Sequence, residues 1–275
     1  MAKDHWSSDK YSSAASFVPQ LTSKVISYLN TQPADRILDL GCGDGVLTAQ
    51  IAQSASQGEV LGLDASASFI QSAQQTYATP NCTFKHHDCT QLDRCPEAVD
   101  GSWDKVFSNA AMHWILRNPE TRQNFFANVN KSLKQDGKFV FEMGGNGNVA
   151  EVQAAATAAL LHAGVPLAEA REASPWFFPS TTHISDLLSN AGFDVEVCEH
   201  EYRSTKLTAE TAGKSGGLEG WVRLMCAQFI DAAPEGKRDA VAREICEVIE
   251  PVVTRHEDGS KWMGYCRLRA VGRKK

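Results

Sequence analysis

Three glycines and two aspartates stand within one short stretch of the chain, LDLGCGDG at residues 38–45. Gly41, Gly43 and Gly45 suit a sharp strand-to-helix turn against a ligand, because glycine has no Cβ and tolerates positive φ angles. A dinucleotide site would need glycine or alanine where the chain has Val46, and a phosphate-binding loop would need the sequence Gly-Lys-Ser/Thr. The stretch therefore predicts a nucleotide-type loop without the signature of a diphosphate site.

The acids of this stretch indicate the charge of the ligand. Asp39 and Asp44 lie where the N–H groups of a helix start would otherwise attract a phosphate, so a diphosphate is repelled and a cation is favoured. Asp64 ends the next predicted strand, from which a carboxylate can accept hydrogen bonds from both hydroxyls of a ribose. A cationic nucleoside satisfies both observations, so the residues indicate S-adenosylmethionine. The alternative is a structural glycine turn, with Asp64 at the start of a helix.

Short apolar runs alternate with helical periodicity through the first half of the chain, which is typical of βαβ units and a parallel sheet. Ser66 is expected to cap one helix, and Pro119 to open another that buries Phe125 and Phe126. Strands are predicted at residues 36–40, 59–64, 82–88, 103–110 and 138–143.

The second half reads as mostly helical, with extended runs at residues 193–204 and 261–273. One helix is predicted to continue through Trp221, Met225 and Phe229. A longer helix after Pro234 is expected to bury a stripe of four apolar residues, Val241, Ile245, Val248 and Val252.

Composition excludes several classes of protein. With 27 basic and 33 acidic residues the chain has a formal charge of -6, which offers no broad cationic surface to a nucleic acid. It contains no apolar run of about eighteen residues and no apparent secretion signal, so no membrane partner is predicted and a cytoplasmic location is expected. The eight cysteines are scattered, and the residues of HHDC (86–89) alternate between strand faces, so no metal site is predicted.

Four motifs in order resemble those of the class I S-adenosylmethionine-dependent methyltransferases: LDLGCGDG, LGLDAS at residues 61–66, HHDCTQL at 86–92 and WDKVFSNAAMHW at 103–114. Within that class the chain is similar to the trans-aconitate methyltransferases and related small-molecule enzymes. The resemblance implies an α/β fold, a doubly wound, mostly parallel seven-stranded sheet with a helical cap. The expected divisions are an N-terminal lid segment at 1–30, a cofactor-binding core at 31–147, and a cap with the last strands at 148–275.

The resemblance also assigns cofactor contacts. Asp64 would hold the ribose, Asp88 would accept the adenine amino group, and a segment with two aromatic residues near the N-terminus would close over the cofactor. The residues expected to contact the cofactor are Trp6, Tyr11, Asp39, Gly41, Cys42, Gly43, Gly45, Asp64, Ala65, Ser66, Asp88, Cys89, Asn109 and Ala110.

Six residues are candidates for the acceptor side. His113 follows the fourth strand, where open α/β sheets bind ligands, and would act as a base or orient an acceptor oxygen. Each candidate has a structural alternative: His113 as a turn cap, the aromatic residues as core, the arginines on a solvated face. The six are His113, Trp114, Trp176, Phe177, Arg223 and Arg267.

We therefore expect methylation of a small molecule, with a carboxylate oxygen as the preferred acceptor. A carboxylate is already a nucleophile at neutral pH, whereas a hydroxyl needs a general base. Alternatives are methylation of a hydroxyl, thiol or carbon, a protein methyltransferase with a partner subunit, or a non-catalytic protein that binds the cofactor. The acceptor and the oligomeric state are not predicted.

Overall fold

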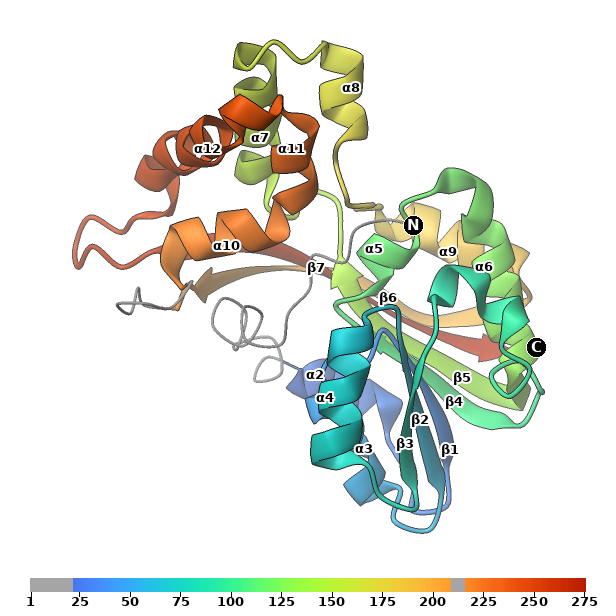
Figure 1. Cartoon of the computed structure of the whole chain (residues 1–275). Helices are drawn as coiled ribbons and strands as arrows, with labels where there is room; N and C mark the ends of the chain where they lie inside the picture. Colours follow the sequence, from blue (N-terminus) through green and yellow to red (C-terminus); the bar gives the residue numbers. More distant parts are fainter. Residues whose placement is uncertain (1–21, 209–215) are drawn as a thin grey trace. The chain divides into compact units, whose positions relative to one another are not determined.

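The computed structural model describes residues 22–208 and 216–275 of the chain. Seven strands form one sheet in the order β3-β2-β1-β4-β5-β7-β6 (Figure 1). β1 pairs in parallel with β2 and β4, β2 with β3, and β4 with β5, whereas β7 runs antiparallel to β5. The predicted mostly parallel, doubly wound α/β fold is confirmed. The strands are β1 (Arg36–Leu40), β2 (Glu59–Asp64), β3 (Cys82–His86), β4 (Trp103–Asn109), β5 (Leu133–Gly144), β6 (Phe193–Lys206) and β7 (Trp262–Lys274).

Helices cover both faces of the parallel strands (Figure 1). Ile37 of β1 packs in one apolar cluster with α2 (Ser23–Leu29), α3 (Val46–Ser54) and α4 (Ala67–Tyr77). Leu38 and Leu40 point to the other face, into a second cluster with η2 (Cys89–Arg94), α5 (Met112–Ile115), α6 (Pro119–Ser132) and α9 (Thr181–Asn190). A strand that is buried on both faces is expected to carry apolar residues in succession, as Ile37 and Leu38 of β1 do.

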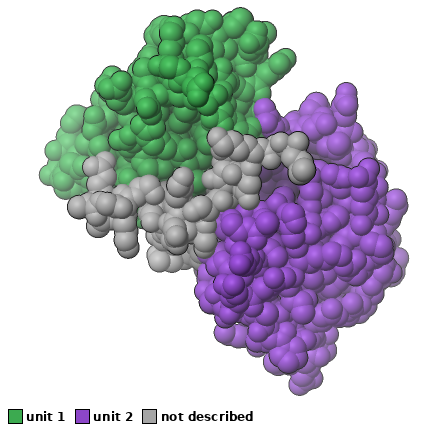
Figure 2. All heavy atoms as spheres, viewed as in Figure 1, with its two compact units in different colours: residues 1–17, 147–176, 202–266 green, residues 18–146, 177–201, 267–275 purple. Residues whose placement is uncertain are grey.

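The chain divides into two compact units, coloured separately in Figure 2. Of the described residues, the sheet unit contains 22–146, 177–201 and 267–275, and the helical unit contains 147–176, 202–208 and 216–266. In the helical unit, α7 (Ala150–His162) and α12 (Arg238–Val253) pack together, with α8 (Leu167–Glu172), α10 (Gly217–Met225) and α11 (Ala227–Ala232) against them. A short 3-10 turn, η3 (Glu235–Lys237), precedes α12. The domain divisions expected from sequence stay predictions.

Two helix predictions in the helical unit were wrong. The helix expected through Trp221 and Phe229 is interrupted at Cys226, whose φ of -98° and ψ of 15° leave the helical range, so α10 and α11 are separate. The predicted buried face of α12 is also displaced: Val248 is 50% exposed and Val252 69% exposed.

The buried stripe of α12 continues from Val241 and Ile245 to Ile249 and Val253. Steps of four residues keep side chains on one helix face, whereas Val248 and Val252 lie one residue earlier and about 100° away. Because Val248 and Val252 are apolar, the prediction placed them on the buried face in the second half of the helix.

Replacing Ile249 by alanine should lower the free energy of unfolding by about 2–5 kcal/mol, because the truncation leaves a cavity among packed helices. Val252→Ala removes an exposed side chain and should change that free energy by about 0.5 kcal/mol or less. Urea unfolding followed by circular dichroism measures both variants. Equal losses would contradict the assignment of the buried face.

Candidate active site

The glycine loop after β1 is fixed by backbone hydrogen bonds to the end of β2. The N–H groups of Gly41 and Cys42 both donate to the carbonyl of Leu63, at 2.8 and 3.0 Å. Gly41, Gly43 and Gly45 have φ angles of 77°, 57° and 84°, which disfavour any residue with a side chain. The loop therefore has the sharp strand-to-helix turn that its glycines predict.

The three glycines differ in what surrounds them. A Cβ on Gly41 would lie 2.2 Å from the Cβ of Ala111, and one on Gly45 would lie 2.8 Å from the ring of Phe84. A Cβ on Gly43 would meet no atom within 4 Å among the described residues. Gly41 and Gly45 are thus required by the packing of the chain itself, whereas the backbone of Gly43 faces open space that a ligand can occupy.

Asp39 is a buried carboxylate at the carboxyl end of β1. Its side chain accepts a hydrogen bond of 2.6 Å from the hydroxyl of Thr48 on α3. Burial raises the pKa of Asp39 to about 7, the Thr48 hydrogen bond opposes that rise, and the nearby charge of Asp64 adds to it. A carboxylate with this pKa favours a cationic group beside it.

Asp64 connects the glycine loop to the start of α4. One of its oxygens accepts from the N–H of Gly43 at 3.0 Å, and the other accepts from the N–H of Ser66 at 2.8 Å. These bonds place Asp64 directly beside the loop, and Ser66 rather than Asp64 is the N-cap of α4. Asp64 therefore does not cap the helix; it connects the glycine loop to the N-cap residue Ser66.

The residues predicted to face the adenine lie after β2 and β3. Ala65 and Ser66 follow β2, and Asp88 precedes η2, where one carboxylate oxygen accepts from the N–H and the hydroxyl of Thr90, at 2.9 and 2.8 Å. Cys89 is buried in the adjoining core. Local hydrogen bonds thus fix this segment near the carboxyl end of β3.

Strain and an unpaired polar atom mark the end of β4. Ala110 has a φ of 56°, which is rare for alanine, and its N–H donates to the carbonyl of Glu142 at 2.8 Å. The buried Oδ1 of Asn109 has no hydrogen-bond partner among the described residues. An orphaned acceptor of this kind is costly unless a ligand supplies a donor. β1 and β4 flank the point where the strand order reverses, which is where such sheets bind ligands.

His113 is buried at the start of α5 in a neutral state. Burial lowers its pKa well below the ordinary value, and the positive charge of Arg267 lowers the pKa further. The Nδ1 atom accepts from the N–H of Gly144 at 3.4 Å, so the proton of the neutral ring belongs on Nε2. The rings of Trp114 and Phe178 lie 5.4 and 5.6 Å from the His113 ring.

The neighbouring aromatic residues Phe177 and Phe178 make different contacts. The N–H of Phe177 donates to the carbonyl of His113 at 2.9 Å, but its ring lies against the core under the guanidinium of Arg122. Phe178, the next residue and not among the six acceptor candidates, has its ring beside that of His113. Its place after Trp176 and Phe177 in the run SPWFFPS (174–180) was the available signal.

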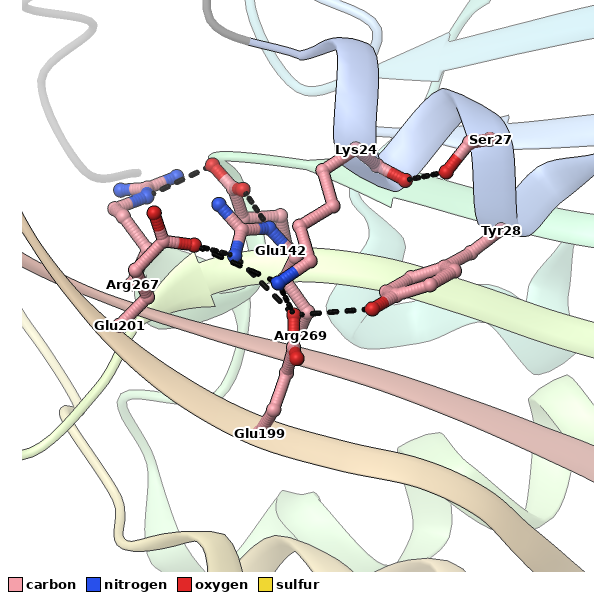
Figure 3. Close-up of polar contacts among 8 residues, drawn as sticks. All are labelled: Lys24, Ser27, Tyr28, Glu142, Glu199, Glu201, Arg267 and Arg269. Carbon is pink, nitrogen blue, oxygen red and sulfur yellow. Dashed lines mark hydrogen bonds and ion pairs between the residues drawn. The ribbon is translucent and has the colours of Figure 1, made fainter.

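Arg267 on β7 is a buried arginine, 5% exposed, with one strong partner. Its Nε atom donates to Glu142 of β5 at 2.9 Å, in a network drawn in Figure 3. Within the described residues, no hydrogen bond engages the two terminal guanidinium nitrogens of Arg267. Sequence reasoning missed Glu142, which stands within an otherwise apolar strand, FVFEM.

Two further candidates, Trp176 and Arg223, belong to the helical unit. There, Trp176 packs edge-on against Phe229, and Arg223 pairs with Glu219 and Asp239 at 2.8 and 2.9 Å. Trp6 and Tyr11 lie outside the described residues.

Metal-ligand clusters and membrane-spanning helices are both absent from the described chain. No group of three metal-ligating side chains is found in residues 22–208 and 216–275. No helix within these ranges is long and apolar enough to cross a membrane.

The family follows from comparison with known proteins. Residues 37–137 match the model of a methyltransferase domain. The whole chain is 35% identical over 278 residues to the uncharacterized methyltransferase C70.08c of Schizosaccharomyces pombe, with all of both chains covered. It is 33% identical to the trans-aconitate 2-methyltransferase of Deinococcus radiodurans over 114 residues, 42% of this chain and 41% of that protein.

The fold is shared with a solved structure, an S-adenosylmethionine-dependent methyltransferase from Anabaena variabilis. The TM-score is 0.55 at 14% identity, over 92% of this chain and 84% of that one. The chain belongs to the S-adenosylmethionine-dependent methyltransferases. The buried acid at position 39, the orphaned Asn109 carbonyl and the open space over Gly43 fit a cofactor with cationic groups and hydrogen-bond donors.

The raised pKa of Asp39 predicts a pH-dependent stability difference. The unfolded chain releases this proton near the ordinary value of 3.8, whereas the folded protein keeps it up to about 7. The folded state therefore binds more protons in this window, and its free energy of unfolding falls as pH rises through it, by about 1 kcal/mol per pH unit.

Asp39→Asn keeps an acceptor for Thr48 and removes the titration. Urea unfolding of both proteins at several pH values should show that the wild type loses stability relative to Asp39→Asn as pH rises from about 4 to 7. A difference that is constant across this range would show that Asp39 ionises normally.

Proposed function

We propose that this methyltransferase transfers a methyl group to a carboxylate oxygen of a small-molecule metabolite. The observation that carries the proposal is Arg267, a buried guanidinium whose terminal nitrogens have no hydrogen-bond partner among the described residues. It lies close enough to His113 to lower that residue's pKa. A planar guanidinium matches a carboxylate with two parallel hydrogen bonds.

We assign a role to each proposed cofactor contact from its position in the fold. Asp39 and the Asn109 carbonyl are suited to the amino-acid portion, and Asp64 to the ribose hydroxyls, because its two held oxygens retain lone pairs. The loop and the segments after β2, β3 and β4 would supply the remaining contacts to the cofactor. These residues are Gly41, Cys42, Gly43, Gly45, Ala65, Ser66, Asp88, Cys89 and Ala110.

For this reaction the main task of the protein is to align the acceptor oxygen with the methyl group of the cofactor. S-adenosylmethionine supplies an electrophilic methyl group on a sulfonium. The residues of this chain would hold the acceptor oxygen in line with that methyl group and exclude water, which can supply much of the acceleration. The products would be a methyl ester and S-adenosylhomocysteine, with the S–CH3 bond broken as the O–CH3 bond forms. Trp114 and Phe178 beside His113 are suited to excluding water. Arg267 would hold the acceptor.

The state of His113 favours a carboxylate over a hydroxyl acceptor. A general base works best with a pKa near the working pH, and the pKa of His113 is shifted well below that range. With Nδ1 accepting from Gly144, its Nε2–H can donate to an acceptor oxygen and orient it. A carboxylate needs such orientation and no deprotonation.

Further support comes from a relative and from the thiols. The relative from Deinococcus radiodurans is named for trans-aconitate, a carboxylate acceptor. All eight cysteines are free, which suits a reducing compartment such as the cytoplasm.

Trp176, Phe177 and Arg223 remain proposed acceptor contacts. Each of them packs against or pairs with other side chains of the protein, and the bond between Phe177 and His113 gives Phe177 the most direct connection to the site.

The experiment that tests the function is methyl transfer to a library of organic acids. Product mass should rise by one methylene, and mild base should hydrolyse the product if it is an ester. Calorimetric titration with S-adenosylmethionine and S-adenosylhomocysteine tests the cofactor separately. Cofactor binding without turnover on any acid would favour a non-catalytic role, and a base-stable product would favour a hydroxyl, thiol or carbon acceptor.

Removing the ribose acceptor should weaken cofactor binding. Asp64→Asn retains the shape but loses the charge that strengthens its hydrogen bonds, so the Kd for S-adenosylhomocysteine should rise about tenfold or more. Asp93→Asn, at an exposed position of η2, is the matched control and should leave the Kd unchanged. Calorimetry measures both, and an unchanged Kd in Asp64→Asn would remove Asp64 from the cofactor site.

A substitution at His113 distinguishes a residue that orients the acceptor from one that acts as a general base. His113→Ala should lower kcat by about tenfold or less with a carboxylate acceptor, because only orientation is lost. Loss of a general base for a hydroxyl would cost about 10²–10⁴-fold. Initial rates with saturating cofactor give kcat and KM. A loss in the larger range would show that His113 moves a proton and would count against a carboxylate acceptor.

A further inference from the structure

A carboxylate on β5 joins the two buried arginines of β7. Glu142 accepts from Arg267 Nε at 2.9 Å through one oxygen and from Arg269 Nε at 2.6 Å through the other (Figure 3). We propose that Glu142 is a positioning residue for the acceptor, which fixes the guanidinium of Arg267 so that its terminal nitrogens remain available to an anion. This inference rests on the proposed function, in which Arg267 binds the acceptor.

The sheet register explains why one acid reaches both arginines. In the antiparallel β5–β7 pair, Glu142 stands opposite Arg269, and Gly144 stands opposite Arg267. Arg267 and Arg269 are two residues apart and therefore on one face of β7, as is the side chain of Glu142 across from them. Gly144 contributes no side chain, which leaves room for Arg267 to lie diagonally toward Glu142.

The shape of the guanidinium makes this contact directional. Its three nitrogens lie in one plane, so a hydrogen bond at Nε restricts the plane and the direction of both terminal nitrogens. The Nε atom is used by Glu142, and the end that carries the terminal nitrogens can still bind a carboxylate through two parallel bonds. Glu142 thus uses the part of Arg267 that an end-on anion does not need.

Glu142 is in turn held by an outer shell of charges. The Nη1 atom of Arg269 lies 3.3 Å from Glu199 and 2.5 Å from Glu201, both on β6. From α2, Lys24 contacts Glu199 at 2.7 Å and Tyr28 donates to it at 3.2 Å (Figure 3). These contacts immobilise Arg269, which holds the second oxygen of Glu142 and keeps its carboxylate from rotating.

The backbone of Glu142 reaches the same site by another path. Its carbonyl accepts the N–H of the strained Ala110, between Asn109 and the segment that carries His113. One residue therefore connects the end of β4 to the guanidinium on β7.

The charges predict the effect of a substitution at Glu142. Arg267 and Arg269 are 5% and 2% exposed, and Glu142 is the acid that both share. Glu142→Gln removes the charge between them and replaces one acceptor oxygen by an amide nitrogen, so one arginine loses its partner. Arg269 retains Glu199 and Glu201, so Arg267 is the residue expected to move.

The test compares Glu142→Gln with Glu199→Gln, which weakens the outer shell and leaves Arg267 untouched. Methyl transfer is assayed with trans-aconitate as the acceptor, and S-adenosylhomocysteine binding is measured by calorimetry. Glu142→Gln should raise the acceptor KM about tenfold or more, with kcat changed less than about threefold and the cofactor Kd within about twofold. Glu199→Gln should change the KM less than about twofold, because Glu201 still holds Arg269.

A double-mutant cycle distinguishes positioning from stability. If Glu142 acts through Arg267, then Arg267→Gln and the double variant with Glu142→Gln should share one raised KM. Additive increases in KM, or equal KM values in Glu142→Gln and Glu199→Gln, would overturn the proposal.

Nitrogen-15 spectra of the arginine Nε–H groups provide a readout without any acceptor, and they serve also if Glu142→Gln does not fold. In the wild type the Arg267 Nε–H, assigned through Arg267→Lys, should exchange slowly with solvent. It should exchange rapidly in Glu142→Gln and stay slow in Glu199→Gln. Rapid exchange in the wild type, or no change in Glu142→Gln, would overturn the inference. If no acid is methylated by the wild type, the proposed function fails, and these spectra still decide whether Glu142 holds Arg267.

Discussion

Buried carboxylates at the carboxyl ends of the central strands are the constraint on which the site depends. A charge removed from water must be matched by donors or cations, and the chain matches its acids unequally. Glu142 has two arginines, whereas Asp39 has the hydroxyl of Thr48 as its one donor in the described contacts and a pKa of about 7. Glu142, with its two cationic partners, therefore stabilises the framework, whereas Asp39 is suited to a ligand that carries a positive charge.

The cost of burying charge also explains why His113 is neutral beside the buried Arg267. Two cations placed close together without water repel each other, so the charge of Arg267 and the burial of His113 keep the imidazole unprotonated. The result is a site with one permanent positive charge and one neutral donor. Such a pair would suit the anionic acceptor that we propose, and it places no second positive charge in a site that also has to hold a sulfonium.

Much of the sheet unit is predictable because its signals are local. The glycine loop, the Ser66 cap and the apolar strands each depend on a few adjacent residues, and the structure has them where the sequence indicates. Glu142 was missed because its partners are more than a hundred residues away on an antiparallel strand, and a lone acid in FVFEM carries no local signal. The buried face of α12 was misplaced for a related reason: Val248 and Ile249 are equally apolar, and the tertiary contacts that choose between them are distant in sequence.

The contact between Gly41 and Ala111 has a consequence for redesign. Because a methyl group at position 41 would overlap that of Ala111, the two positions share a volume that admits one small side chain. Libraries that aim to enlarge or reshape the acceptor space should hold both positions constant and vary the aromatic neighbours of His113. Among natural homologues, a bulkier residue at either position should occur only with a displaced loop.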